Sequence, residues 1–397
     1  MEGRVMRIAY VCADPGIPVF GSKGASVHVQ EVLRVLLRSG HEVDLFCRRT
    51  GGEPPAALAA AIDERQLRVH AAERISDSDA ARREEKLITA DAELTAVIAA
   101  KHAVRGYDVV YERYALFSTA GTTVARAAGV PSILEVNAPL PIEQATHRRL
   151  VRADVADGIA RTVLADATAV ICVSDAVAAW ARTLVPASRV HVEPNGVDPE
   201  RFREAARSQA RFTVGFVGTL KPWHGTDALV DAVRILDRPE TRLVIVGDGP
   251  ERDALTQQAR AAGVDVEFAG AVDPVDVPGR LAQFDVAVAP YPAHGDTYFS
   301  PLKVLEYMAA GVAVVASRVG QIPELVDHGR TGILVPGSDP RALADALDAL
   351  AADPAQRARL GSAARADVMR HRTWTDVVER SFAAADLALR VPEGAVR

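Results

Sequence analysis

The hydrophobic and polar positions of the chain follow a repeating pattern, in which short apolar runs alternate with amphipathic stretches of helical period. In the first half, the apolar runs predict strands near residues 7–13, 42–48, 67–70, 107–113, 132–137, 169–174 and 190–198. In the second half, they predict strands near residues 212–218, 242–249, 266–270 and 312–316. Such alternation of strand and helix predicts parallel sheets that are covered by helices on both faces.

Two series of these units predict two domains. The 397 residues exceed one ordinary domain, and 49% of them are hydrophobic, which is enough for two cores. The turn Pro194-Asn195-Gly196, followed by a polar stretch at 199–210, predicts the boundary near residue 200. We therefore expect domains at 1–200 and 201–375, followed by a last helix and a disordered tail at 376–397.

Composition narrows the class of protein. Acidic residues outnumber basic ones by 52 to 46, for a formal charge of −6, so neither nucleic acid nor an anionic membrane is an expected partner. Cys12, Cys47 and Cys172 lie in apolar runs, and their odd number favours a reducing compartment. The first apolar run, 8–11, is too short for a signal peptide, and no later run approaches about 18 residues. We expect a soluble cytoplasmic protein, either a monomer or a homodimer.

The stretch 299–317, FSPLKVLEYMAAGVAVVAS, carries the strongest chemical signal. Ser300 and Pro301 predict a helix that starts at 300 with Ser300 as its cap, and Gly311 predicts its end. Lys303 and Glu306 are neighbours on one face of that helix. A helix N-terminus and a lysine attract phosphate, and a carboxylate accepts ribose hydroxyls, so this stretch predicts a nucleotide-sugar pocket.

With Ala289-Pro290 before it and 329–336 (GRTGILVP) after it, this stretch resembles the donor-binding signature of family-4 glycosyltransferases. The resemblance implies the GT-B fold, two Rossmann-like doubly wound domains facing a central cleft, with the last helix crossing back to the first domain. The family signature has two glutamates separated by seven residues. Glu306 matches the second, which holds the donor ribose, and Tyr298 stands in place of the first. The donor-binding residues implied here are Tyr298, Phe299, Ser300, Pro301, Leu302 and Glu306.

The loop after the strand at 212–218 is the implied diphosphate clamp. Family members carry an arginine and a lysine where this chain has Thr219 and His224, and Lys221 lies between the two. We expect Lys221 and His224 to share the charge-neutralising role with Lys303; the alternative is a degenerate clamp in a slow or inactive enzyme. By resemblance, Gly247 and Gly249 lie beside the nucleoside, and Val272 lies against the base.

The first half offers weaker candidates. Gly21, Lys23 and Gly24 lie between the first strand and the first helix, where a loop gives backbone room for a diphosphate or an acceptor. His28, one turn into that helix, is a candidate acceptor contact or a packing residue. Asn137 stands where many family members have a sugar-contacting histidine, and Glu135 shares its strand face and is a candidate for holding hydroxyls. Arg148, in a basic cluster with Arg149 and Arg152, is either solvated or a patch for an anionic acceptor.

The resemblance implies a retaining transfer from a nucleoside-diphosphate sugar, with UDP or GDP as the nucleotide, to a small soluble acceptor. It implies front-face substitution without an obligatory metal or cofactor. The alternatives are a nucleotide-sugar-binding protein with decayed catalysis, suggested by Tyr298, Thr219 and Asn137, and an epimerase or phosphorylase of the same fold. A nicotinamide oxidoreductase is disfavoured, because neither half has the required glycine spacing and acidic residue.

Overall fold

The computed structural model describes residues 4–202, 211–293, 298 and 300–389. These residues form two compact units: one takes in the chain up to Asn195 together with the segment from Trp374 onward, and the other spans Gly196–Thr373. The polar stretch from 203, Phe299 and the tail from 390 lie outside the described residues.

The first unit is built on a sheet of seven parallel strands in the order β3-β2-β1-β4-β5-β6-β7. The strands are β1 (Arg7–Cys12), β2 (Glu42–Cys47), β3 (Leu67–Ala71), β4 (Val109–Arg113), β5 (Ser132–Val136), β6 (Ala169–Cys172) and β7 (Val190–Val192). Crossover helices connect them: α1 (Gly24–Arg38), α2 (Ala56–Asp63), α3 (Ala80–Arg105), α4 (Ala120–Ala128), α5 (Leu140–His147), α6 (Ala153–Asp166) and α7 (Asp175–Arg182).

The last helix, α15 (Trp374–Ala383), belongs to the first unit although it is the most distant in sequence. The Trp374 ring packs on His28 of α1, with ring centroids 4.6 Å apart, and Phe382 packs on Tyr111 of β4. Arg380 also forms an ion pair with Glu193, just after β7, at 2.6 Å. Aromatic packing and one ion pair thus hold α15 on this unit.

The second unit contains a parallel sheet of six strands in the order β10-β9-β8-β11-β12-β13. These are β8 (Phe212–Val217), β9 (Thr241–Val246), β10 (Val266–Gly270), β11 (Val286–Ala289), β12 (Ala313–Ser317) and β13 (Ile333–Val335). The helices are α8 (Thr226–Leu236), α9 (Arg252–Ala262), α10 (Val277–Leu281), α11 (Leu302–Ala309), α12 (Ile322–Leu325), α13 (Pro340–Ala352) and α14 (Pro354–His371).

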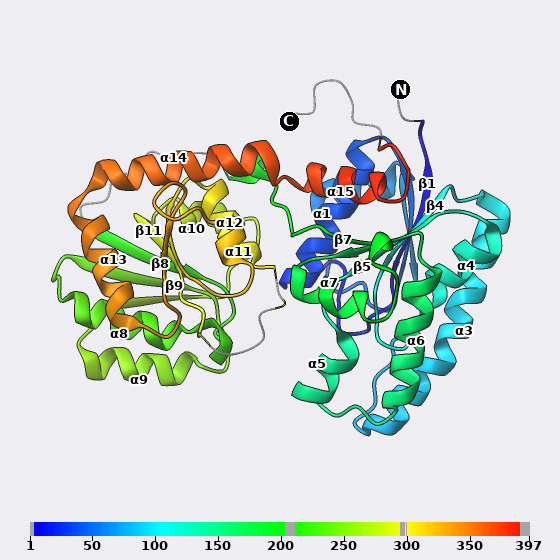
Figure 1. The fold of residues 1–397 in the computed structure, drawn as a ribbon, viewed down its shortest axis with the longest axis horizontal. Coiled ribbons are helices and arrows are strands. Elements are labelled where there is room, and N and C mark those ends of the chain that lie inside the picture. The colour runs from blue at the N-terminus through cyan, green and yellow to red at the C-terminus, as the bar shows by residue number, and fades with distance from the viewer. Residues whose placement is uncertain (1–3, 203–210, 294–297, 299, 390–397) are drawn as a thin grey trace. The chain divides into compact units, whose positions relative to one another are not determined.

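Alternate residues of these strands face two separate cores. In β9, Val244 and Val246 join the core that holds buried side chains of α11, α12 and α14, whereas Leu243 and Ile245 join the core of α8, α9 and α13. The same alternation occurs in β11 and β12. The sheet is therefore covered on both faces, as the near-continuous apolar strands predicted (Figure 1).

One local prediction, the start of the helix in the donor stretch, was wrong. The helix expected to start at Ser300 starts at Leu302, and Pro301 occupies the cap position without a side-chain cap. Pro301 has φ −81° and ψ 90°, because a backbone that reaches a helix through proline enters from an extended conformation. The region after Pro340 consists of three helices, α13, α14 and α15 (Trp374–Ala383), and the side chain of Asp353 caps the second of them by accepting from Gln356 N.

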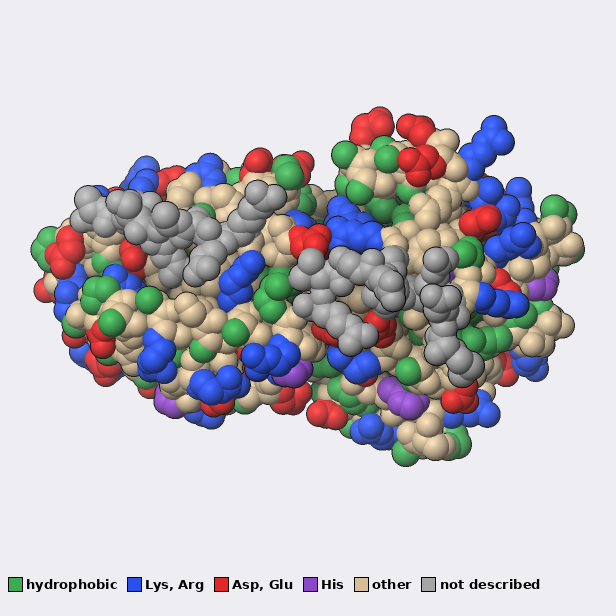
Figure 2. Space-filling view, turned by 90° about the horizontal axis from the view of Figure 1, so that it is seen from above, with side chains coloured by type: hydrophobic (Ala, Val, Ile, Leu, Met, Phe, Trp, Pro, Cys, Tyr) green, Lys and Arg blue, Asp and Glu red, His purple; other side chains and the backbone are tan. Residues whose placement is uncertain are grey.

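Positive and negative side chains are interspersed over the face shown in Figure 2, in keeping with the small net charge. Among the described helices, none combines the length and the apolar character that a membrane crossing requires.

Candidate active site

Loops at the carboxyl ends of β8 and β9 pack backbone against backbone in the second unit. Gly218 N donates to Val246 O at 2.9 Å, and Leu220 N donates to Asp248 O at 3.0 Å. Gly247 has φ 138°, and a Cβ there would lie 1.9 Å from Gly218 O. Only glycine allows this approach. The two loops therefore form a fixed backbone rim, made of 218–220 and 247–249, at the carboxyl ends of the strands, where open α/β folds bind ligands. We call this rim the edge.

The ammonium of Lys303 lies against this edge. Its Nζ is buried and, within the described part of the chain, has no hydrogen-bond partner. It lies 4.3 Å from the ring centroid of Phe216 and 5.2 Å from that of Tyr291, and a Cβ on Gly218 would lie 2.8 Å from it. Burial lowers the pKa of Lys303 to about 7, while the nearby carboxylate of Glu306 acts to raise it. A buried cation that no described residue hydrogen-bonds is suited to an incoming anion.

His224 lies beside Lys303 at the end of the short turn Pro222–His224. Its Nδ1 is next to Thr219 O, and a carbonyl can only accept, so Nδ1–H donates and Nε2 carries the lone pair. Burial, then the charges of Lys303 and Lys221, lower the pKa of His224 to about 4, although the bond to Thr219 opposes them. At neutral pH the imidazole is uncharged, so positive charge at this edge comes from the two lysines.

Lys221 begins the same turn and is held differently from Lys303. Its Nζ lies 5.5 Å from the ring centroid of Trp223, whose side chain is exposed. Gly225 closes the turn with φ 64°, and a Cβ there would lie 1.9 Å from Pro290 O. The turn is therefore pressed onto the end of β11, and it carries a half-buried lysine and an exposed indole.

Helix α11 is fixed to β8 by one buried hydroxyl. Tyr307 OH accepts from Val217 N at 2.9 Å and donates to Val217 O at 3.3 Å, directly before Gly218. At the other end, Gly311 has φ 65°, and Val312 N donates to Tyr307 O at 3.1 Å. These bonds end the helix at the predicted glycine and set Lys303 beside Gly218.

The structure places the other predicted donor residues around the same strand ends. Gly249 lies against Leu220, where a Cβ would come within 2.3 Å of its carbonyl oxygen. Val272 packs its side chain on the core behind β10. The remaining residues lead into or lie on α11: Tyr298 and Glu306 are half-buried, Ser300 and Pro301 are buried, and Leu302 is half-buried.

In the first unit, the carboxylate of Glu135 is the centre of a buried polar network at the end of β5. Oε1 accepts from Arg113 Nη1 at 2.5 Å and from Asn137 Nδ2 at 2.6 Å. Oε2 accepts from His28 Nε2 at 2.7 Å and from Tyr111 OH at 3.0 Å. Four donors occupy both oxygens, so the carboxylate orients its neighbours and has no acceptor position left for a substrate hydroxyl.

In this network, the negative carboxylate of Glu135 is paired with the positive guanidinium of Arg113. Burial acts to raise the pKa of Glu135, but the charges of His28 and Arg113 and the bonds to His28 and Asn137 lower it to about 2. Burial lowers the pKa of His28, against the opposing effect of Glu135. His28 donates Nε2–H to the carboxylate, and its ring packs on Trp374. Asn137 is half-buried, and with its Nδ2 bound to Glu135 its Oδ1 is directed away from the carboxylate.

The loop between β1 and α1 is held by the helix that follows it. Gln30 Nε2 donates to Val19 O at 2.9 Å and to Gly21 O at 2.8 Å. A Cβ on Gly21 would lie 2.8 Å from Pro18, which explains the glycine. Lys23 occupies the cap position of α1 without a side-chain cap, and both Lys23 and Gly24 are exposed. The loop thus presents these two residues on an ordered backbone.

Arg148 lies apart from this network. It follows α5, is exposed, and donates to Gln144 Oε1 at 3.4 Å. Two members of the network, Arg113 and Tyr111, were not predicted from the sequence. A signal was present: both are polar residues two apart in an apolar strand, and Arg113 pairs in register with Glu135 of the next strand.

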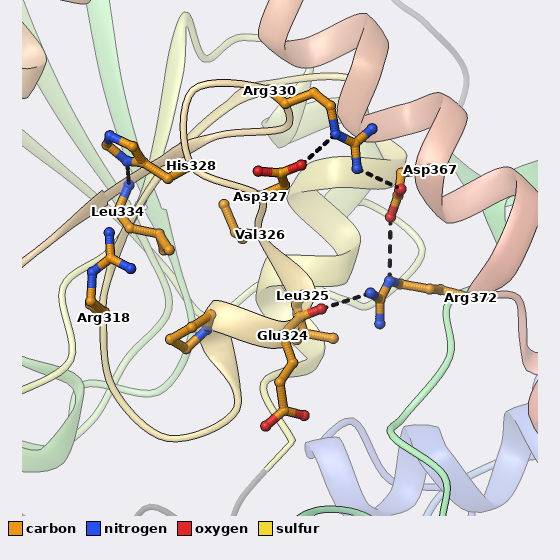
Figure 3. A pocket seen from close by; sticks show the side chains of 11 residues that line it. Arg318, Glu324, Leu325, Val326, Asp327, His328, Arg330, Leu334, Asp367 and Arg372 are labelled. Carbon is orange, nitrogen blue, oxygen red and sulfur yellow. Dashed lines mark hydrogen bonds and ion pairs between the residues drawn. The ribbon is translucent and has the colours of Figure 1, made fainter.

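A separate pocket of about 340 Å³ lies in the second unit between α12, the turn that follows it, and α14 (Figure 3). Arg330 pairs with Asp327 at 2.6 Å and with Asp367 at 3.3 Å, while Arg372 pairs with Asp367 at 3.4 Å and donates to Glu324 O at 2.7 Å. None of the predicted site residues lines it. The positive and negative side chains neutralise one another, so we assign this series of ion pairs to holding α12 against α14.

Comparison with known structures gives the class of fold first: the two parallel-sheet α/β units are those of the GT-B fold. Sucrose-phosphate synthase from Thermosynechococcus elongatus matches with a TM-score of 0.72 at 22% identity, covering 94% of this chain and 97% of that one. Anabaena HepE in complex with UDP-glucose matches with a TM-score of 0.69 at 19% identity, covering 96% and 99%. These likenesses confirm the predicted fold.

The chain belongs to glycosyltransferase family 4. The model of Glycosyltransferase Family 4 matches residues 22–201, and that of Glycosyl transferases group 1 matches residues 211–353. A D-inositol 3-phosphate glycosyltransferase of Acidothermus cellulolyticus is 32% identical over 95% of this chain and 88% of its own. A GDP-mannose-dependent alpha-(1-6)-phosphatidylinositol monomannoside mannosyltransferase of Mycolicibacterium smegmatis is 34% identical over 47% of this chain and 53% of its own.

Proposed function

We propose that this glycosyltransferase moves a sugar from a nucleoside-diphosphate sugar to a small hydroxyl-bearing acceptor and keeps the anomeric configuration. The donor diphosphate binds at the edge formed by Gly218, Lys303 and the start of α11, and the acceptor binds at the strand ends of the first unit, near Asn137. The observation that carries the proposal is the buried Lys303 ammonium without a partner among the described residues. An anion is the ligand that such a group would stabilise most.

In this proposal, the bond between the anomeric carbon and the β-phosphate oxygen breaks, and negative charge grows on that phosphate. Lys303, Lys221 and the N–H groups at the start of α11 stabilise the charge; fixed donors of this kind often contribute several kcal/mol. The acceptor oxygen forms the new bond on the same face, and its proton passes to the departing phosphate oxygen. Neither a metal nor another cofactor is required for these steps.

Two features support the choice of substrates. Among the relatives, one mannosyltransferase is named as GDP-mannose-dependent, and HepE binds UDP-glucose, so UDP and GDP are the nucleotides to test first. The full-length relative is named for D-inositol 3-phosphate, a polyol phosphate, and such a compound fits the small soluble acceptor that we propose here. Tyr298, which offers a phenol where family members have a carboxylate, is the position that we expect to select the donor sugar.

The test is a thermal-shift screen against UDP, GDP, ADP and TDP, repeated with Glu306→Ala, because a ligand of the native state raises the melting temperature. We expect one nucleotide to shift the wild type and the shift to be lost in the variant. Glu251→Ala, an acidic residue at the start of another helix, serves as a matched control that keeps the shift. If every nucleotide is silent, or the shift is indifferent to Glu306, the donor site is misplaced. Binding without sugar transfer to any polyol acceptor would favour the decayed binder.

A further inference from the structure

We propose that the second unit takes up one proton together with its diphosphate ligand, and that the proton goes to Lys303. This inference rests on the proposed function, since it assumes that the diphosphate binds beside this residue. It concerns how the protein prepares the site, and it makes affinity for the donor depend on pH in the neutral range.

The geometry leaves Lys303 poorly suited to carry a charge before the ligand arrives. Its Nζ faces the rings of Phe216 and Tyr291 and the backbone of Gly218, and no described residue accepts a hydrogen bond from it. Two aromatic faces supply only part of the solvation that an ammonium loses on burial. A neutral amine therefore competes with the ammonium in the free protein.

Among the described residues, the titratable groups around Lys303 do not supply the missing charge. From the loop after β8, His224 is neutral at pH 7 and Lys221 repels a second cation. From the loop after β11, Tyr291 presents an aromatic face, and burial raises its pKa to about 13.

The other titratable groups on α11, the helix that carries Lys303, do not supply a full counter-charge either. Burial raises the pKa of Tyr307 well above its usual value, and its hydroxyl is spent on Val217. Within the described part of the chain, Glu306 is the acidic group that favours the ammonium of Lys303, and burial outweighs it, which brings the pKa of Lys303 to about 7.

A bound diphosphate reverses this balance. The diphosphate of a nucleotide sugar carries two negative charges across the neutral range and has no group of its own that titrates there. Placed beside Nζ, it favours the ammonium and raises the pKa of Lys303. Free protein above pH 7 must then gain a proton on binding, so affinity falls as the pH rises, by up to about tenfold per pH unit.

The experiment is isothermal titration calorimetry with UDP-glucose and GDP-mannose between pH 6.5 and 8.5. At pH 8, titrations in two buffers of different ionisation enthalpy measure the protons taken up, and we expect roughly 0.8 to 0.9 per site. Lys303→Arg keeps a permanent cation, so it should bind with no uptake and a flat pH profile. His224→Asn should retain the uptake at pH 8, because a proton taken up by His224 would appear only under more acidic conditions.

Each result decides between the two proposals. Binding by the wild type with no uptake at pH 8 and an unchanged dissociation constant overturns the proton linkage and leaves the donor site standing. Proton uptake that persists in Lys303→Arg or in Lys303→Met assigns the proton to another group, and this result overturns the proton linkage as well. Should neither probe bind at any pH, the donor site itself fails, and the linkage with it. If the lysine variants do not fold, uptake in the wild type that is half-complete near pH 7, and is kept in His224→Asn, still supports the assignment.

Discussion

Glu135→Gln should destabilise the first unit more than any exposed charge substitution. The change leaves the buried guanidinium of Arg113 without its counter-charge, and it puts an amide N–H₂ against two of the four donors that the carboxylate accepts. Breaking a buried pair on one side costs about 3–5 kcal/mol. The lowered pKa gives a second route to the same quantity: a change from 4.5 to about 2 corresponds to roughly 3 kcal/mol at neutral pH.

The sign of the pH dependence follows from the same shift. The folded pKa of Glu135 lies below its unfolded value, so its contribution is fully present above about pH 4.5 and is lost as the pH falls toward 2. The wild type should therefore lose its advantage over Glu135→Gln between these values. At pH 7, the melting temperature of the variant should be about 6–20 °C lower, for a unit of this size.

The assay is urea unfolding at pH 7, followed by tryptophan fluorescence in a Trp223→Phe background. Trp180 and Trp374 then report the first unit alone, since both belong to it. The matched control is Glu85→Gln, which removes an exposed pair with Arg152 at 3.4 Å and should cost less than about 1 kcal/mol. A loss below about 1 kcal/mol for Glu135→Gln, or a difference from wild type that stays constant down to pH 3, would refute the assignment of Glu135 as the buried counter-charge.

Two further predictions concern the edge, where Gly218 and Gly247 meet and where we propose that the donor binds. Gly247→Ala forces a Cβ onto the carbonyl oxygen of Gly218 and should cost more than about 3 kcal/mol in the unfolding free energy of the second unit. Gly263→Ala, at a φ of 66° with nothing within 4 Å of the added Cβ, should cost about 1–2 kcal/mol, and equal losses in the two variants would contradict the close approach. Tyr307→Phe leaves the buried Val217 N–H unsatisfied and should cost about 1–3 kcal/mol in urea unfolding, with weaker diphosphate binding; unchanged stability and binding would mean that the hydroxyl does not position the edge.

The sequence by itself determined the architecture and the helix end at Gly311. Apolar runs of strand length, separated by amphipathic stretches, leave a chain no way to bury its strands except between two layers of helix, so the fold followed from local pattern. Gly311 ends its helix because glycine adopts the left-handed backbone conformation more easily than other residues do. The donor stretch identified the family through Glu306 and its neighbours, even though Tyr298 breaks the signature.

Only the tertiary structure decided what the charged residues do. Lys303 and Phe216 lie far apart in the sequence. The aromatic surroundings that bury the ammonium without a described hydrogen-bond partner exist only once α11 has packed on β8. Glu135 was expected to offer its oxygens to a substrate, and the structure gives all of them to four side chains from other segments. Burial and partners set the charge and the availability of a side chain. Both depend on contacts between distant segments, which the spacing of residues along the chain does not contain.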